Sequence, residues 1–145
     1  MKITLLAVGK MKQGAHNDLC QEYIKRLTGT VKIIECTGHT QAEENEALLA
    51  KIDSNACLIV LDERGDSLKS VEFASFIERQ QNNGQSHFQC VIGGADGLLP
   101  EIREKAHLRL ALGKLTWPHM LVRVMLLEQL YRAQQILGKH PYHRE

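Results

Sequence analysis

Short apolar runs rich in β-branched residues alternate along the chain with segments of helical periodicity, and this alternation constrains the fold most. The apolar runs predict strands at residues 2–9, 31–36, 56–62, 87–94 and 107–113. The periodic segments predict helices at residues 16–27, 40–52, 67–84, 99–106 and 120–137. Strands that alternate with helices indicate an α/β domain with a mostly parallel sheet flanked by helices.

Length and composition indicate one globular unit, and we expect a single domain spanning residues 1–145. No apolar run approaches the roughly 20 residues that cross a bilayer. Gly9 and Lys10 end the first apolar run too early for a signal peptide, so we expect a cytoplasmic protein without a membrane partner. The formal net charge of +1 gives no general attraction to nucleic acid, so any RNA-binding surface must be a local patch.

The four cysteines are widely spaced and form no CxxC pair, which predicts reduced thiols packed as small hydrophobic groups. His119, His140 and His143 are weak candidates for metal ligands, because Pro141 favours an extended tail and no carboxylate lies at a suitable spacing. We therefore expect no metal site.

The last predicted helix, residues 120–137, carries apolar side chains on more than one face. A surface helix needs only one apolar stripe. The excess can lie against the sheet alone, but we favour burial against a second copy of the chain, which predicts a homodimer.

Three turns that follow predicted strands have unusual sequences: LDERGDS, IGGADGLLP and LGKLTWPHM. In an open α/β sheet, ligands bind beyond the carboxyl ends of the strands, so these turns are where a site is expected. IGGADG matches neither the GxGxxG fingerprint nor a Walker loop, and a glycine-rich turn after a strand is by itself more often a tight connection. The apolar side chains of the third turn need cover from a helix, from a partner subunit or from a flat ligand such as adenine.

The chain ends in HPYHRE, which contains two histidines, a tyrosine, an arginine and a proline, whereas a terminus without a task usually has no particular composition. This ending, together with MKITLLAVGK at the start, IGGADGL and KLTWPHMLVRVMLLEQLYRA, resembles the RlmH family of SPOUT-class 23S rRNA (pseudouridine-N3)-methyltransferases. The similarity runs in order through the whole chain. Residues 38–56 carry no family motif and are shortened relative to the family pattern.

The resemblance implies a homodimeric SPOUT fold with a C-terminal trefoil knot and S-adenosylmethionine as the methyl donor. The implied acceptor is N3 of a pseudouridine in the 23S rRNA of assembled ribosomes. By position, the implied cofactor contacts fall on the three unusual turns: Leu61, Gly93, Gly94, Leu112, Gly113, Lys114, Leu115, Thr116 and Trp117.

Methylation at N3 requires loss of a proton, for which a group that titrates near neutrality is suited. His119 and His143 are both candidates for this base, as are water and an RNA group. Tyr142 could stack on a base, and Arg123, Arg132 and Arg144 could bind phosphate. Alternatively, Arg123 and Arg132 pair with Glu128 on the helix surface, and His119 has only a structural role.

Two other functions remain open on the sequence alone. One is a ribosome-associated RNA-binding protein of SPOUT fold without turnover. The other is a nucleotide-binding regulatory domain, which explains the glycine-rich turn but not the terminal residues.

Overall fold

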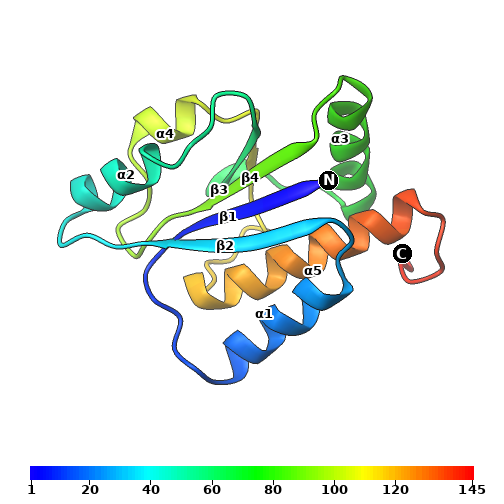
Figure 1. The fold of residues 1–145 in the computed structure, drawn as a ribbon, viewed down its shortest axis with the longest axis horizontal. Helices are drawn as coiled ribbons and strands as arrows, with labels where there is room; N and C mark the ends of the chain where they lie inside the picture. Colours follow the sequence, from blue (N-terminus) through cyan, green and yellow to red (C-terminus); the bar gives the residue numbers. More distant parts are fainter.

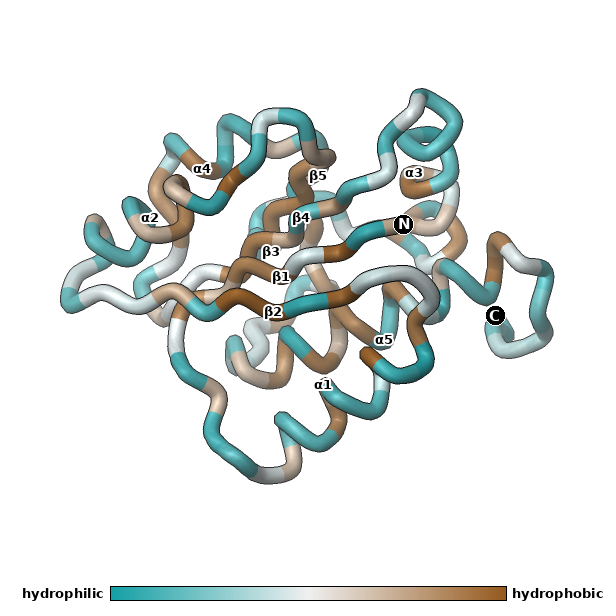
Figure 2. Tube along the Cα trace, viewed as in Figure 1, coloured by the Kyte–Doolittle hydropathy of each residue, from teal (hydrophilic) through white to brown (hydrophobic).

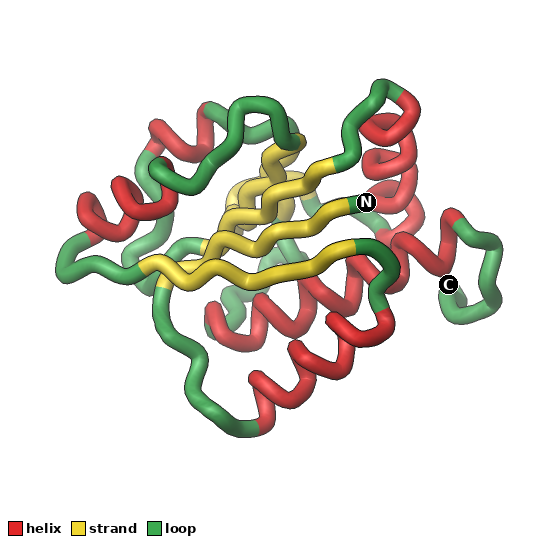
Figure 3. The backbone as a smooth tube through the Cα atoms, viewed as in Figure 1, coloured by secondary structure: helices red, strands yellow, loops and turns green.

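Five parallel strands form one sheet in the order β2-β1-β4-β3-β5, in a computed structural model that describes residues 1–145 (Figure 1, Figure 3). The strands are β1 (Lys2–Val8), β2 (Thr30–Cys36), β3 (Cys57–Asp66), β4 (His87–Ile92) and β5 (Leu108–Leu110). The helices are α1 (Ala15–Arg26), α2 (Gln41–Leu49), α3 (Ser70–Asn82), α4 (Pro100–Glu104) and α5 (His119–Leu137). The predicted parallel α/β architecture is confirmed.

The helices form a layer on each face of the sheet. α1, α3 and α5 pack on one face, where α5 lies between the other two, and α2 and α4 cover the opposite face (Figure 1). The larger core lies between the sheet and the three-helix layer, and a smaller core that includes Leu48 and Ile102 lies beneath α2 and α4. The most apolar segments are accordingly the central strands (Figure 2).

The start of α2 is fixed by side-chain hydrogen bonds of Thr40 and Glu43. The Thr40 side chain accepts a hydrogen bond from the Glu43 amide at 3.1 Å. The Glu43 carboxylate reaches past Thr40 and accepts from the His39 amide at 2.8 Å. The capping arrangement is therefore present, but it extends one residue further back than in a standard capping box.

β3 continues beyond the predicted strand through a bulge. Leu61 and Asp66 both pair with Leu110 of β5, so residues 62–65 loop out of the ladder. Gly65 returns the chain to the strand, and a Cβ there would lie 2.6 Å from the Arg109 carbonyl oxygen. Only glycine fits this approach, and the bulge projects its side chains beyond the edge of the sheet.

α5 runs along the sheet from the carboxyl ends of the strands to the opposite edge, where the C-terminal tail, residues 138–145, lies near the N-terminus (Figure 1). Near its end, the Gln134 side chain hydrogen-bonds both backbone groups of Thr28, in the loop before β2. No helix combines the length and the apolar character that crossing a membrane requires. The trefoil knot stays a prediction.

Candidate functional site

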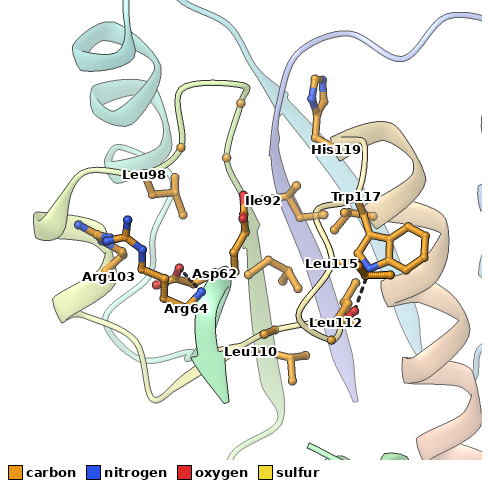
Figure 4. Close-up of a pocket in the computed structure, with 18 of the residues that line it drawn as sticks. Asp62, Arg64, Ile92, Leu98, Arg103, Leu110, Leu112, Leu115, Trp117 and His119 are labelled. Atoms are coloured by element: carbon orange, nitrogen blue, oxygen red, sulfur yellow. Dashed lines mark hydrogen bonds between the residues drawn. The ribbon is translucent and has the colours of Figure 1, made fainter. Parts of the chain in front are cut away.

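A cleft of about 350 Å³ opens at the carboxyl ends of β3, β4 and β5, where all three unusual turns meet (Figure 4). Its lining residues come from the β3 bulge, the turn after β4, the beginning of α4 and the segment from β5 to α5. They are Leu61, Asp62, Glu63, Arg64, Ile92, Gly93, Gly94, Asp96, Gly97, Leu98, Arg103, Leu110, Ala111, Leu112, Gly113, Leu115, Trp117, His119 and Val122.

The glycines after β4 bring backbone close to neighbouring elements. A Cβ on Gly94 would lie 2.9 Å from the Val8 side chain and 3.3 Å from the Glu44 carboxylate. A Cβ on Gly93 would lie 2.9 Å from the Leu98 side chain. Side chains at these positions would displace the turn, so both glycines keep its backbone at the floor of the cleft.

One wall of the cleft is apolar and consists of the loop between β5 and α5. The Trp117 indole N–H donates to the Leu112 carbonyl at 2.8 Å, which folds the loop back on itself. Leu115 is 72% exposed and Trp117 is 39% exposed, although both are large apolar side chains. This wall presents uncovered apolar surface to the cleft, as a site for a flat ring does.

Most sequence-predicted cofactor contacts lie together in this cleft. Leu61, Gly93, Gly94, Leu112, Gly113, Leu115 and Trp117 line it, whereas Lys114 and Thr116 do not. The Thr116 hydroxyl instead donates to the Glu63 carboxylate at 3.2 Å, and this contact joins the apolar loop to the β3 bulge.

His119 is the first residue of α5 and lies at the rim of the cleft. Its imidazole points away from Ile92 and Leu112 in Figure 4. It lies beside the loop after β1, because a Cβ on Gly9 would be 3.9 Å from its Nε2. Of the two histidines considered as a base, His119 alone lines the cleft of its own chain.

The tail packs on the distant half of α5. The Tyr142 hydroxyl donates to the Glu128 carboxylate at 3.0 Å, and its ring lies edge-on to Tyr131 with centroids 4.8 Å apart. Burial, followed by the bond to Glu128, raises the pKa of Tyr142 to about 12. His143 Nδ1 lies 3.1 Å from the Arg132 guanidinium. Because Arg132 is thirteen residues beyond His119, the tail lies roughly 20 Å along α5 from the cleft.

The three arginines expected to bind RNA occupy different environments. Arg132 pairs with Glu128 at 2.6 Å, which is the alternative recognised in the sequence. Arg144 is an exposed residue of the tail. Neither is a cleft residue.

The expectation of phosphate binding fails for Arg123. Its side chain is 1% exposed, and it donates to Glu35 at 2.6 Å and to the Gly9 carbonyl at 2.9 Å. The partner is therefore Glu35 rather than Glu128, and the guanidinium ties α5 to the end of β1. A charge that is buried and already paired is not available to an RNA backbone.

The charged wall of the cleft was not predicted from the sequence. Asp62, Glu63 and Arg64 come from the β3 bulge, Asp96 from the glycine-rich turn, and Arg103 from α4. The LDERGDS motif marked the position of the first three, but only the register shift against β5 shows that they leave the strand.

The four cysteines are buried and free, as predicted. Burial raises the pKa of the Cys57 thiol to about 11 and of the Cys90 thiol to about 12, which keeps them protonated. The structure contains no group of three or more His, Cys, Asp or Glu side chains arranged to hold a metal ion.

Comparison with known proteins relates the whole chain to methyltransferases. A family model described as "Predicted SPOUT methyltransferase" matches residues 1–143. A protein of Bradyrhizobium diazoefficiens named Ribosomal RNA large subunit methyltransferase H is 44% identical over 159 positions, covering 99% of both chains. A protein of the same name from Rhodospirillum centenum is 46% identical over 151 positions, again covering 99% of both. The first alignment is longer than this chain, so that relative contains residues that this chain lacks.

The fold also has a counterpart among solved structures. A probable methylase family protein from Haemophilus influenzae Rd KW20 aligns with a TM-score of 0.55, covering 99% of this chain and 70% of the other. The two sequences are 13% identical, so the likeness concerns the fold alone.

Proposed function

The chain belongs to the SPOUT methyltransferase family, and from this premise we propose that it transfers a methyl group from S-adenosylmethionine to 23S rRNA in the ribosome. The acceptor in this proposal is N3 of a pseudouridine. One observation carries it: the three strand-end turns meet in a single cleft, in a chain with full-length similarity to proteins named for methylation of large-subunit rRNA.

The chemistry of the cleft fits this methyl donor. The exposed apolar surface of Leu115 and Trp117 suits an adenine ring, and the backbone of Gly93 and Gly94 lines the same cleft. Asp62, Glu63 and Asp96 supply negative charge for a ligand that carries a sulfonium and an ammonium group. When bound, S-adenosylmethionine supplies an electrophilic methyl group on its sulfonium.

The chain's own residues contribute position and proton acceptance. The walls of the cleft hold the donor in place beside the acceptor ring, and such positioning supplies much of the rate of a two-reactant transfer. His119 at the rim is the one histidine that lines the cleft within one chain, and it is a candidate base. His143 of the tail is the other candidate, with water or an RNA group as alternatives.

A homodimer is part of the proposal, because the tail cannot reach the cleft of its own chain while it packs on the far half of α5. Leu121, Val122 and Met125 of α5 remain only partly buried within one chain, although the helix is enclosed by α1 and α3. A second copy placed on this surface would cover them and would bring its tail toward the cleft. Tyr142 and Arg144 of one subunit would then contact RNA bound at the cleft of the other subunit.

Transfer of labelled methyl groups from S-adenosylmethionine to ribosomes of a strain that lacks the gene tests the function. The proposal expects label in the RNA, dependent on the protein and lost when ribosomes are omitted. Binding of S-adenosylmethionine without transfer would favour a ribosome-binding protein of SPOUT fold. Preference for ATP or NAD over S-adenosylmethionine would favour a nucleotide-binding regulator.

A further inference from the structure

Two arginines of the cleft have no partner inside the protein. Arg64 comes from the β3 bulge and Arg103 from α4, and both line the cleft. The structure has four ion pairs, and neither arginine takes part in one. In Figure 4 both side chains lie on the side of the cleft opposite Leu115 and Trp117.

The carboxylates nearest to these arginines in the chain are engaged elsewhere. Asp62 accepts a hydrogen bond from the backbone amide of Arg64 at 3.0 Å. Glu63 accepts from the Thr116 hydroxyl at 3.2 Å. Neither guanidinium group therefore has an ion-pair partner, and the charge and planar set of donors of each are unused within the protein.

The backbone fixes the positions from which the side chains of Arg64 and Arg103 extend. The bulge exists because Leu61 and Asp66 pair with the same residue of β5, and Gly65 is needed to close it. On α4, the fully buried Ile102 anchors the turn that carries Arg103. The β3 bulge and α4 thus each place a positive charge at the same cleft. An anion bound to both arginines would offset the repulsion between them.

We propose that Arg64 and Arg103 form a phosphate-binding pair that holds the backbone of the RNA substrate at the mouth of the cleft. This inference rests on the proposed function, since it names how that substrate is held. Guanidinium groups bind phosphate oxygens through two parallel hydrogen bonds, and phosphate contacts fix the register of a nucleic acid on a protein.

An RNA phosphate suits this pair better than the carboxylate of the methyl donor. The donor has one carboxylate and two cationic groups, whereas the cleft has two arginines without an ion pair, of which Arg64 is exposed to solvent. The pair also supplies unpaired positive charge, which Arg123 and Arg132 do not supply, because Arg123 is buried and Arg132 is paired with Glu128.

Steady-state methylation of ribosomes by Arg64→Gln, Arg103→Gln and the double variant tests the pair. Each single change is expected to raise KM for ribosomes by about tenfold, the loss typical of a charge-assisted contact, with kcat unchanged. The slope of log KM against log salt should flatten by roughly one for each arginine removed. The dissociation constant of S-adenosylmethionine, measured by calorimetry, should not change.

Arg79→Gln is the matched control. Arg79 lies in the last turn of α3, is exposed and makes no ion pair, so the same charge change there should leave KM for ribosomes within error. An unchanged KM in the double variant would overturn the proposal. So would weaker binding of S-adenosylmethionine without a change in KM for ribosomes, which would place the pair on the carboxylate of the donor.

Failure of the proposed function is a separate result. If the unaltered protein transfers no methyl group, sedimentation with ribosomes at increasing salt replaces the kinetic assay. Weaker and less salt-dependent cosedimentation of the double variant would still support the phosphate-binding pair. Equal cosedimentation of the two proteins would refute it.

Discussion

Arg123 and Glu35 form a buried-to-surface ion pair that joins the beginning of α5 to the end of β2, with 2.6 Å between Nη1 and Oε2. The same Glu35 oxygen accepts the backbone amide of Met11 at 2.7 Å. Arg123 also donates to the carbonyl groups of Val8 and Gly9. One guanidinium thereby fixes the loop after β1 against the helix that carries His119.

Arg123→Met should lower the free energy of unfolding by about 3 kcal/mol, because the carbonyl groups of Val8 and Gly9 and the partly buried Glu35 carboxylate lose the guanidinium that donates to them. Urea denaturation measures this difference. Arg132→Met is the comparison, since its Glu128 pair lies less deeply buried on the surface of the same helix, and it should cost less. An equal or smaller loss for Arg123→Met would contradict the assigned role.

The same ion pair predicts a dependence of stability on acid. Burial acts to raise the pKa of Glu35, but the hydrogen bonds from Arg123 and Met11 outweigh it and hold the pKa below its ordinary value of 4.5. The unfolded state then binds the proton first as pH falls, so stability is lost below about pH 4.5. Glu35→Gln should be less stable at neutral pH and should lose less on acidification to pH 3 than the unaltered protein.

His87 should cause a second loss of stability at a higher pH. Burial and the charge of Lys2 lower the pKa of His87 below its ordinary value of 6.5, against the opposing charge of Asp53. The folded state therefore resists protonation, and the free energy of unfolding should fall as pH drops below about 6.5. His87→Gln should lack this step in melting curves recorded from pH 7.5 to 5.5. An identical step in the variant would assign it to another group.

Trp117 is the single tryptophan of the chain and lies on the apolar wall of the cleft, so it should report donor binding directly. Titration with S-adenosylmethionine should change the intrinsic fluorescence with a saturating curve. Trp117→Ala should weaken binding by about tenfold through loss of apolar contact. NAD at the same concentrations is the control ligand and should leave the fluorescence unchanged apart from absorption. Saturation by NAD but not by S-adenosylmethionine would contradict the assignment of the site.

The turns that form the site can be predicted from the sequence, because the strands and turns follow from short-range sequence patterns. The rule that α/β ligands bind beyond the carboxyl ends of parallel strands predicts a site at the strand-end turns that contain Leu61, Gly93 and Trp117. The bulge that exposes Arg64 depends on pairing between Leu61, Asp66 and a strand more than forty residues away, which no local pattern encodes. The burial of Arg123 likewise depends on partners in β1 and β2.

The position of the tail was also beyond prediction from the sequence. HPYHRE indicates a segment with a role, but the direction of α5 decides which edge of the sheet the segment reaches. Contacts of Tyr142 and His143 with Glu128 and Arg132 place it at the edge away from the cleft of its own chain. That separation makes the second copy of the chain necessary to any catalytic role for the tail.

Mixed dimers test whether the tail acts across subunits. If the tail acts in trans, a dimer of one His143→Ala chain and one Trp117→Ala chain retains one cleft in which both residues are intact. If the tail acts in cis, that dimer retains none. Purified mixed dimers should therefore be active in the first case and inactive in the second. The converse dimer, of an unaltered chain with a chain that carries both changes, should be inactive if the tail acts in trans and half active if it acts in cis. Full methylation by His143→Ala and Tyr142→Ala homodimers would remove the tail from the mechanism.

Mapping the methylated atom tests the central claim most directly. Ribosomes from a strain lacking the gene would be incubated with the protein and labelled S-adenosylmethionine, and the 23S rRNA would then be digested and analysed by mass spectrometry. The account predicts one labelled nucleotide, a pseudouridine methylated at N3. Label on another atom or on another RNA would contradict the proposed acceptor, and absence of label despite donor binding would contradict the proposal that the protein is an enzyme.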